Sequence, residues 1–206
     1  MQGKTALAGI LKQEGVEFVF CFPSNPIIDA AASVGIRPII ARMERGAINM
    51  ADGYTRVNNG SKNGVCLVQA GPGIENAFSG VAQAFADSSP ILMLPGHNGT
   101  QRQGMLSDFS ASVNFAGVTK WADLINHPDR IPEMLRRAYT QLRMGPPGPV
   151  LLEMPADVLE GEIDESRLHY APVAKRRSAG DPRDVASVAR RLLGARRPVI
   201  YAGQGV

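Results

Sequence analysis

Short apolar runs alternate with amphipathic stretches along most of the chain. The runs are continuously hydrophobic, which is typical of strands that are buried on both faces. In the amphipathic stretches, apolar residues recur at the spacing of a helix. The pattern predicts strands at 17–22, 37–42, 64–69, 90–94, 121–125 and 149–154, and helices at 5–13, 25–33, 45–57, 74–86 and 130–143.

This alternation predicts a fold of the α/β class, a doubly wound, mostly parallel sheet with helices on both faces. Ligands of such sheets bind outside the carboxyl ends of the strands. Loops 23–26, 71–73 and 96–99 each follow a predicted strand. Glu44 marks a further junction, where an apolar run turns into a helix. We therefore expect these four segments to line one rim of the sheet.

The alternation lapses after the last predicted strand of this sheet. Residues 164–182 are mainly charged or small, which predicts a linker. Beyond it, 184–193 has the pattern of an amphipathic helix and 198–202 that of a strand. One helix and one strand cannot bury a core of their own. We therefore expect a domain at 1–163 and, at 183–206, the first elements of a second, truncated domain, so that the chain is a fragment.

Composition narrows the possible functions. The 206 residues are 44% hydrophobic, 20% charged and 6% aromatic, as in an ordinary globular protein. Net charge is only +3, and the basic clusters are not interleaved with aromatic residues, so we expect no nucleic-acid partner. No apolar segment approaches the roughly 20 residues of a membrane span, and no signal-peptide core is present. We expect a cytoplasmic protein that has no membrane partner.

Side chains that could carry chemistry unaided are sparse. Cys21 and Cys66 lie within apolar runs, where cysteine behaves as a small buried hydrophobe. No His, Cys and Asp cluster has the spacing of a metal site, so no metal ligands are predicted. His97, Ser107 and Asp108 could be combined into a triad, but the sequence has no Gly-x-Ser-x-Gly elbow. By elimination, catalysis would need a cofactor.

Glu44 and the glycines at 71–73 are the most informative residues. An acidic residue at a helix start often only complements the helix dipole. Glycines between a strand and a helix let a ligand approach the backbone, although the same residues also fit a plain tight turn. The loop at 71–73 has neither the Lys and Ser/Thr of a P-loop nor a dinucleotide fingerprint, and Gly203 with Gly205 is too weak a dinucleotide signal.

Motifs along the chain strengthen the functional interpretation of Glu44. After Glu44 come, in order, Met50-Ala-Asp-Gly-Tyr54, Gln69-Ala-Gly-Pro-Gly-Ile-Glu-Asn76 and Asp87-Ser-Ser-Pro-Ile-Leu-Met-Leu-Pro-Gly96. Glu44 and these three motifs together resemble the pyrimidine-binding domain of thiamine-diphosphate enzymes, and more narrowly the acetolactate synthase and benzoylformate decarboxylase branch. The resemblance runs from Thr5 to about residue 157, and 196–203 resembles the start of the family's central domain.

The resemblance implies roles for individual residues. In the family, the glutamate at the position of Glu44 hydrogen-bonds a ring nitrogen of the cofactor's aminopyrimidine and so promotes proton removal from the thiazolium carbon. We expect Ile40, Met43 and Ile48 to bury this carboxylate. The residues implied to bind the cofactor are Pro23, Ser24, Glu44, Gly71, Pro72 and Asn76.

The resemblance also implies partners. The cofactor would be thiamine diphosphate with Mg²⁺, the metal being held by a Gly-Asp-Gly…Asn motif in a domain that this chain does not contain. The site would lie at the subunit interface of a homodimer or tetramer, and this fragment alone would be inactive. A flavin, FAD, is possible in the family but is not indicated here. The implied substrate is a small 2-keto acid, which is decarboxylated, joined to a second carbonyl, or both.

Departures from the family pattern affect the substrate side. Acetolactate synthases usually have Phe-Gln-Glu where this chain has Leu106-Ser107-Asp108. Ser107, together with His97 and Asn98, is therefore a candidate for facing the substrate. His97 could equally be a surface-loop histidine without function. Met43 stands where His is common, and Ser24 where Gly is usual.

Two other functions compete with this one. The first is a non-catalytic α/β module of the same fold, which binds a ligand or mediates oligomerisation. The second is a nicotinamide-dependent Rossmann enzyme, which requires a full glycine fingerprint near the N-terminus. Residues 22–25 do not provide one, so the second alternative is disfavoured.

Overall fold

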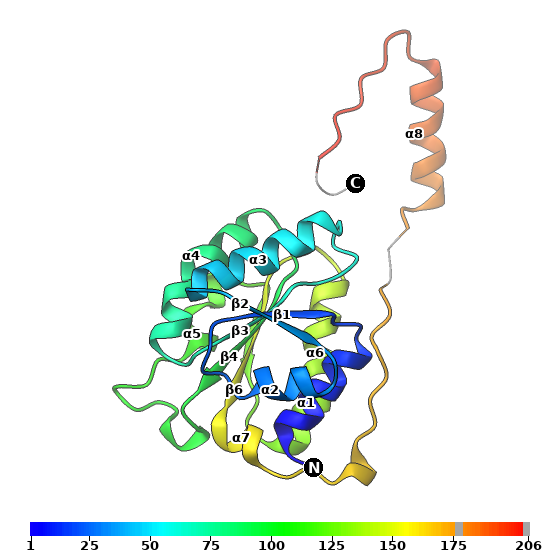
Figure 1. The fold of residues 1–206 in the computed structure, drawn as a ribbon. Coiled ribbons are helices and arrows are strands. Elements are labelled where there is room, and N and C mark those ends of the chain that lie inside the picture. The colour runs from blue at the N-terminus through cyan, green and yellow to red at the C-terminus, as the bar shows by residue number, and fades with distance from the viewer. Residues whose placement is uncertain (176–178, 204–206) are drawn as a thin grey trace. The chain divides into compact units, whose positions relative to one another are not determined.

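Six strands form one parallel sheet in the computed structural model, which describes residues 1–175 and 179–203. The strands lie in the order β2-β1-β3-β4-β6-β5, and every pairing is parallel (Figure 1). The predicted doubly wound α/β fold is confirmed. The strands are β1 (Phe18–Cys21), β2 (Arg37–Ile40), β3 (Val65–Val68), β4 (Leu92–His97), β5 (Trp121–Leu124) and β6 (Val150–Pro155).

Helices cover both faces of this sheet (Figure 1). They are α1 (Gly3–Gln13), α2 (Ile27–Ser33), α3 (Glu44–Val57), α4 (Pro72–Ala86), α5 (Ala111–Asn114), α6 (Ile131–Arg143) and α7 (Ala156–Glu160), with short 3₁₀ helices at Thr100–Arg102, Ala116–Val118, Pro128–Arg130 and Glu165–Arg167. Residues of α1, α2, α6 and α7 share one hydrophobic cluster, and residues of α3, α4 and α5 share another.

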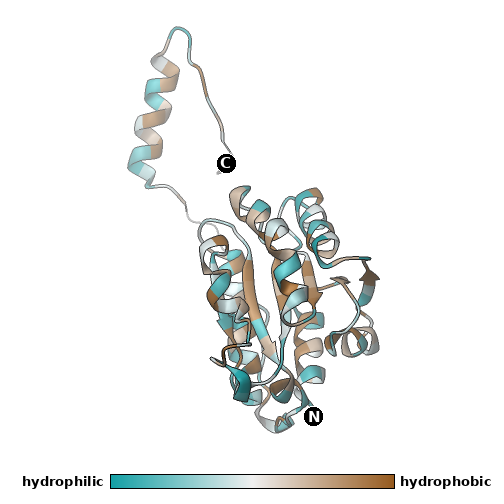
Figure 2. Cartoon of the chain, turned by 90° about the vertical axis from the view of Figure 1, so that its left-hand side faces the viewer, coloured by the Kyte–Doolittle hydropathy of each residue, from teal (hydrophilic) through white to brown (hydrophobic). Residues whose placement is uncertain are grey.

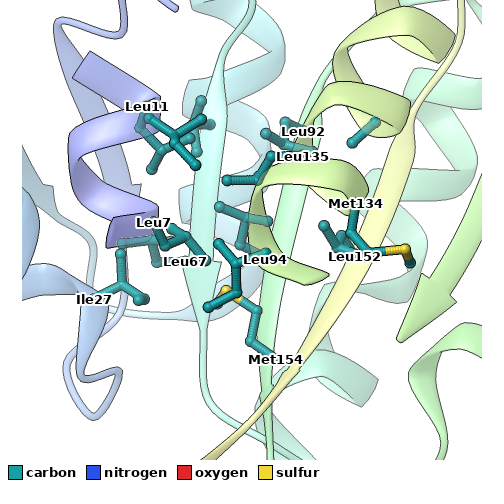
Figure 3. Packing of buried hydrophobic residues seen from close by; sticks show 14 of the residues in the cluster. Leu7, Leu11, Ile27, Leu67, Leu92, Leu94, Met134, Leu135, Leu152 and Met154 are labelled. Atoms are coloured by element: carbon teal, nitrogen blue, oxygen red, sulfur yellow. The ribbon is translucent and has the colours of Figure 1, made fainter. Parts of the chain in front are cut away.

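The two clusters lie on opposite faces of the sheet. In β3, Val65 and Leu67 belong to the first cluster, whereas Cys66 and Val68 belong to the second. Successive side chains of a strand point to opposite faces, so both sets must be apolar. Figure 3 shows the first cluster, and Figure 2 shows the apolar residues concentrated on the strands between the helices. This double burial explains the continuous apolar runs of the sequence.

The two cysteines are buried and free, as predicted. Burial raises the pKa of the Cys21 thiol to about 11, and it raises the pKa of Cys66 well above its ordinary value. Both thiols therefore stay protonated and act as small apolar side chains.

Some predicted elements differ from the structure. Strand β4 continues three residues beyond the predicted end and includes Pro95, Gly96 and His97. Helices α5 and α7 were not predicted, because each is too short to show a helical period. Instead, each has a hydrogen bond from another element at one end. Glu153 of β6 accepts the first two backbone N–H groups of α5, and the Gly3 amide of α1 donates to Gly161, which follows α7.

The chain divides into two compact units, Met1–Ala174 and Lys175–Val206. The second contains α8 (Pro182–Gly194), none of whose residues is buried. No strand is formed at 198–202, so that prediction was wrong: a strand needs a neighbour for its backbone hydrogen bonds, and the described part of this unit offers none. The assignment of 183–206 to a truncated domain stays a prediction. Gly205 and two residues of the basic cluster at 175–177 lie outside the described residues.

A buried carboxylate attaches the end of the first unit to its core. The Glu14 side chain, at the end of α1, is fully buried and forms an ion pair with Arg143 of α6. The same carboxylate accepts hydrogen bonds from the Tyr170 hydroxyl and from the Val173 amide, the latter at 3.1 Å. Burial beside Glu14 raises the pKa of Tyr170, which keeps the phenol as a donor. The first unit thus extends into the range predicted as a linker.

We predict that Glu14→Ala lowers the free energy of unfolding by about 3 kcal/mol, because it leaves the largely buried Arg143 without its carboxylate. It should also expose 168–173 to proteases. Urea unfolding and limited proteolysis would measure both effects. The matched control is Glu17→Ala, since Glu17 forms its ion pair with Lys62 at the surface and should matter much less. Equal stability of the two variants would contradict this role of Glu14.

Candidate functional site at the carboxyl ends of the strands

Glu44 lies at the point where the chain leaves β2 and enters α3. It is the first residue of the helix, after Met43 in extended conformation. The residue is only 8% exposed. Of the three apolar residues expected to bury it, Ile48 is buried, but Ile40 and Met43 are 55% and 46% exposed. That part of the prediction was wrong, because β2 is an edge strand and has no further strand beside it.

Helix α4 buries the Glu44 carboxylate instead. The Asn76 side-chain amide donates to Glu44 Oε2 at 2.7 Å. Within the described residues, Oε1 has no hydrogen-bond partner. The structure therefore brings Glu44 and Asn76 together at the neighbouring N-termini of α3 and α4, with one carboxylate oxygen left available.

The glycines before α4 are required by this geometry. Gly71 has a φ of +61°, which favours glycine, and precedes Pro72 at the first position of the helix. A Cβ atom on Gly73 would lie 2.7 Å from Cβ of Gln69 and 3.4 Å from Oε1 of Glu44. The absence of that atom leaves the space beside Oε1 open. These glycines therefore allow the tight turn and a close approach to Oε1.

Pro23 and Ser24 are exposed in the loop between β1 and α2. Ser24 has a φ of +91°, a region that strains any residue with a side chain. The next residue, Asn25, is 6% exposed and donates hydrogen bonds to β3 and β4. Sequence reasoning placed Asn25 in the rim loop 23–26 and at the start of a helix, but gave it no role of its own, although an asparagine between two prolines was a possible signal.

His97 is neither in a loop nor at the surface. It is the last residue of β4, and its side chain is 1% exposed. Nε2 lies 2.9 Å from Oδ2 of Asp108, and Nδ1 accepts the backbone N–H of Gly99 at 3.2 Å. A ring nitrogen that accepts a hydrogen bond carries no proton, so the proton is on Nε2. The Nε2–H group then donates a hydrogen bond to Asp108. Neither ring nitrogen is free for a substrate, and the surface-loop interpretation was wrong.

Of the other two substrate-facing candidates, Asn98 and Ser107 are both exposed. They belong to the connection between β4 and α5, which is held in place by one carboxylate of β6 and one of α7. Asp157 accepts bonds from the backbone and hydroxyl of Thr100, and Glu153, 1% exposed, accepts the first two N–H groups of α5. Sequence reasoning missed these two acids, although a glutamate within an apolar run was a usable signal.

Among residues 1–175 and 179–203, no group of three or more His, Cys, Asp and Glu side chains could hold a metal ion. Over the same residues, no helix has the length and apolar character needed to cross a membrane.

Comparisons with known proteins point to one family. Residues 1–120 match the family described as "Thiamine pyrophosphate enzyme, N-terminal TPP binding domain". The chain is 35% identical over 216 residues to a probable acetolactate synthase large subunit of Methanocaldococcus jannaschii, covering 100% of this chain and 36% of that protein. It is also 35% identical to a probable 2-ketoarginine decarboxylase of Pseudomonas aeruginosa, over 97% of this chain and 37% of the relative.

A third relative is a glyoxylate carboligase of Escherichia coli O157:H7, which is 35% identical over 213 residues, 100% of this chain and 36% of the relative. The chain thus spans a little over a third of the length of these curated relatives.

We predict that Asp108→Ala lowers the free energy of unfolding by about 2 kcal/mol, because the buried Nε2–H of His97 loses its acceptor. Denaturant unfolding would measure this change, and ¹⁵N NMR of the imidazole would test for the Nε2–H form. Asp129→Ala is a matched control, since its carboxylate lies 3.9 Å from the exposed His127. A wild-type His97 protonated on Nδ1 would contradict the assignment.

Proposed function

Because the chain belongs to the thiamine pyrophosphate enzyme family, through the N-terminal TPP binding domain, we propose that it forms the aminopyrimidine-binding half of a thiamine-diphosphate site. Glu44 is the residue that contacts the ring. The observation that carries this proposal is the state of its carboxylate, in which Asn76 holds Oε2 and Oε1 has no partner in the described residues.

The residues around Glu44 fit the ligand. An aminopyrimidine ring nitrogen can share a proton with a carboxylate oxygen, and Oε1 is positioned for that role. Asn76 keeps the carboxylate oriented, and the missing Cβ of Gly73 leaves room beside Oε1 for a flat ring. Pro23, Ser24, Gly71 and Pro72 would shape the remaining wall. In the bound state, thiamine diphosphate supplies an acidic thiazolium carbon that, once deprotonated, attacks a carbonyl.

Glu44 acts in this scheme as the group that holds or releases a proton at Oε1. It lies at the N-terminus of α3 and is only 8% exposed, and Oε1 is the oxygen that Asn76 leaves available. A carboxyl group within hydrogen-bond reach of a ring nitrogen can exchange a proton with it. Asn76 contributes by orientation, since its amide donates to the other oxygen and takes no proton.

The substrate class follows from the names of the relatives. These are an acetolactate synthase, a 2-ketoarginine decarboxylase and a glyoxylate carboligase. We propose a small 2-keto acid as substrate, with decarboxylation, carboligation or both. Asn98 and Ser107, exposed on the same rim, are the candidates for facing it. Mg²⁺ and the diphosphate would be bound by a complementary domain. No residue of the described chain points to a flavin site.

The exposed faces of α3 and α4 support a dimer. Met50 and Val57 of α3 and Met43 just before it are exposed at seven-residue spacing, and Phe78 and Phe85 likewise on α4. The two helices pack against each other. We propose that these side chains form one apolar surface and that a second copy of the protein covers it. Glu44, at the end of α3, would then lie at the margin of the subunit interface.

We predict that Glu44→Gln, in a protein that contains both halves of the site, slows hydrogen–deuterium exchange at C2 of thiamine diphosphate about 100-fold or more. NMR of the quenched cofactor measures this rate. Glu75→Gln is the matched control, because Glu75 is an exposed acid in the first turn of α4 with the same charge. Wild-type exchange in Glu44→Gln would contradict the role of Glu44. No binding of the cofactor by the wild type would favour a non-catalytic module.

We also predict that the double variant Met50→Asp, Phe78→Asp raises the dimer dissociation constant of that protein about tenfold or more, because charges replace apolar contacts. Sedimentation equilibrium measures the constant. The control is Val113→Asp, an exposed apolar residue of α5 outside this surface. A dissociation constant equal to that of the control would place the interface elsewhere.

A further inference from the structure

Asn25 is a buried amide at the rim of the sheet, and the proposed function gives it no role. It lies in the loop between β1 and α2 and is 6% exposed. Its Nδ2 donates to the carbonyl oxygens of Val68 at 3.1 Å and Leu94 at 3.3 Å, and its Oδ1 accepts the Ile27 amide at 3.0 Å. One side chain therefore connects the loop after β1 to β3, to β4 and to the start of α2.

These bonds lie where two paired strands end. Pro95 of β4 pairs in register with Val68 of β3. Asn25 donates to the Val68 carbonyl and to the carbonyl of Leu94, the residue before Pro95. A side chain from a third segment therefore joins β3 and β4 at the end of their pairing.

The same bonds fix the neighbouring turn. Ser24 keeps its strained φ of +91° directly before Asn25. The backbone carbonyl of Asn25 also accepts the Ile28 amide, so this residue is held by both its side chain and its main chain. Strain of this kind persists where the surroundings overdetermine the conformation. Release of Asn25 would let Ser24 relax to a negative φ.

The turn at 23–24 and the turn before α4 are therefore linked. Val68, which accepts from Asn25, lies three residues before Gly71 in the sequence. Pro23 and Ser24 border one side of the proposed pyrimidine pocket, and Gly71 to Gly73 border another. We propose that Asn25 is a positioning residue, whose buried amide sets the separation of these two walls. The identity of the ligand rests on the proposed function, whereas the hydrogen bonds of Asn25 are independent of it.

The chemistry of the amide is specific. Two donors and one acceptor in a planar fork are all used, and only asparagine provides them at this length. An ionised aspartate has the same shape but no donor, and it would face two carbonyl oxygens. Serine is too short to reach both strands and adds no charge.

The experiment compares Asn25→Asp and Asn25→Ser in a protein that contains both halves of the site, at a temperature where both are folded by circular dichroism. We expect the dissociation constant for thiamine diphosphate with Mg²⁺ to rise about tenfold or more, since small misplacements of binding groups have large effects. The constant for magnesium pyrophosphate, which has no pyrimidine, should stay unchanged. A general loss of stability would not produce this split. Asn59→Asp, on an exposed side chain away from the rim, is the matched control.

A second measurement tests the geometry without any ligand. In Asn25→Ser, the three-bond coupling between the amide and α hydrogens of Ser24 should change, because this coupling reports φ. Wild-type affinity for thiamine diphosphate in both folded variants, or an unchanged coupling at Ser24, would overturn the role of Asn25. If the wild type binds no thiamine diphosphate, the proposed function fails, and the coupling still decides whether Asn25 fixes the turn.

Discussion

Burial of the parallel sheet on both faces is the constraint on which the rest of the structure depends. Because the side chains of β3 point alternately to two hydrophobic clusters, this strand has only apolar residues, and Glu153 of β6 is buried with both oxygens bonded. Parallel strands also bring all their carboxyl ends to one edge. Functional side chains can therefore gather only at that rim, in the connections that follow the strands, and Glu44, Asn76, Ser24 and Asn25 all lie there.

The rim is organised by side chains that satisfy backbone groups or one another. Glu153 uses both carboxylate oxygens on the N-terminus of α5, and Asp157 uses both on Thr100. Asn25 donates to one backbone carbonyl of β3 and to one of β4. Glu44 differs from these residues, since one of its oxygens has no partner in the described part of the chain. That difference separates a carboxylate that holds the fold from one that is available for chemistry.

The fold and half of the site could be predicted from the sequence because both depend on local patterns. Apolar runs reveal buried strands, and Glu44 and Asn76 stand in recognisable motifs. The errors arose where contacts between distant parts of the chain determine the structure. The buried position of His97 depends on its contact with Asp108, which lies in a loop with no periodic signal. The exposure of Ile40 follows from the strand order, which an apolar run does not encode. The burial of Glu14 depends on Arg143 and Tyr170, both far along the chain.

The first unit has three features that are unusual for a protein surface. Ser24 has a strained backbone, one Glu44 oxygen has no partner among the described residues, and α3 and α4 expose Met50 and Phe78. Buried hydroxyls without partners do occur elsewhere in the described residues, at Ser89 and Tyr139, so imperfect satisfaction is not confined to the rim. Backbone strain, an available carboxylate and exposed apolar area can be explained together. All three agree with the proposal that a ligand and a second copy complete this surface, where locally unfavourable choices are retained for function.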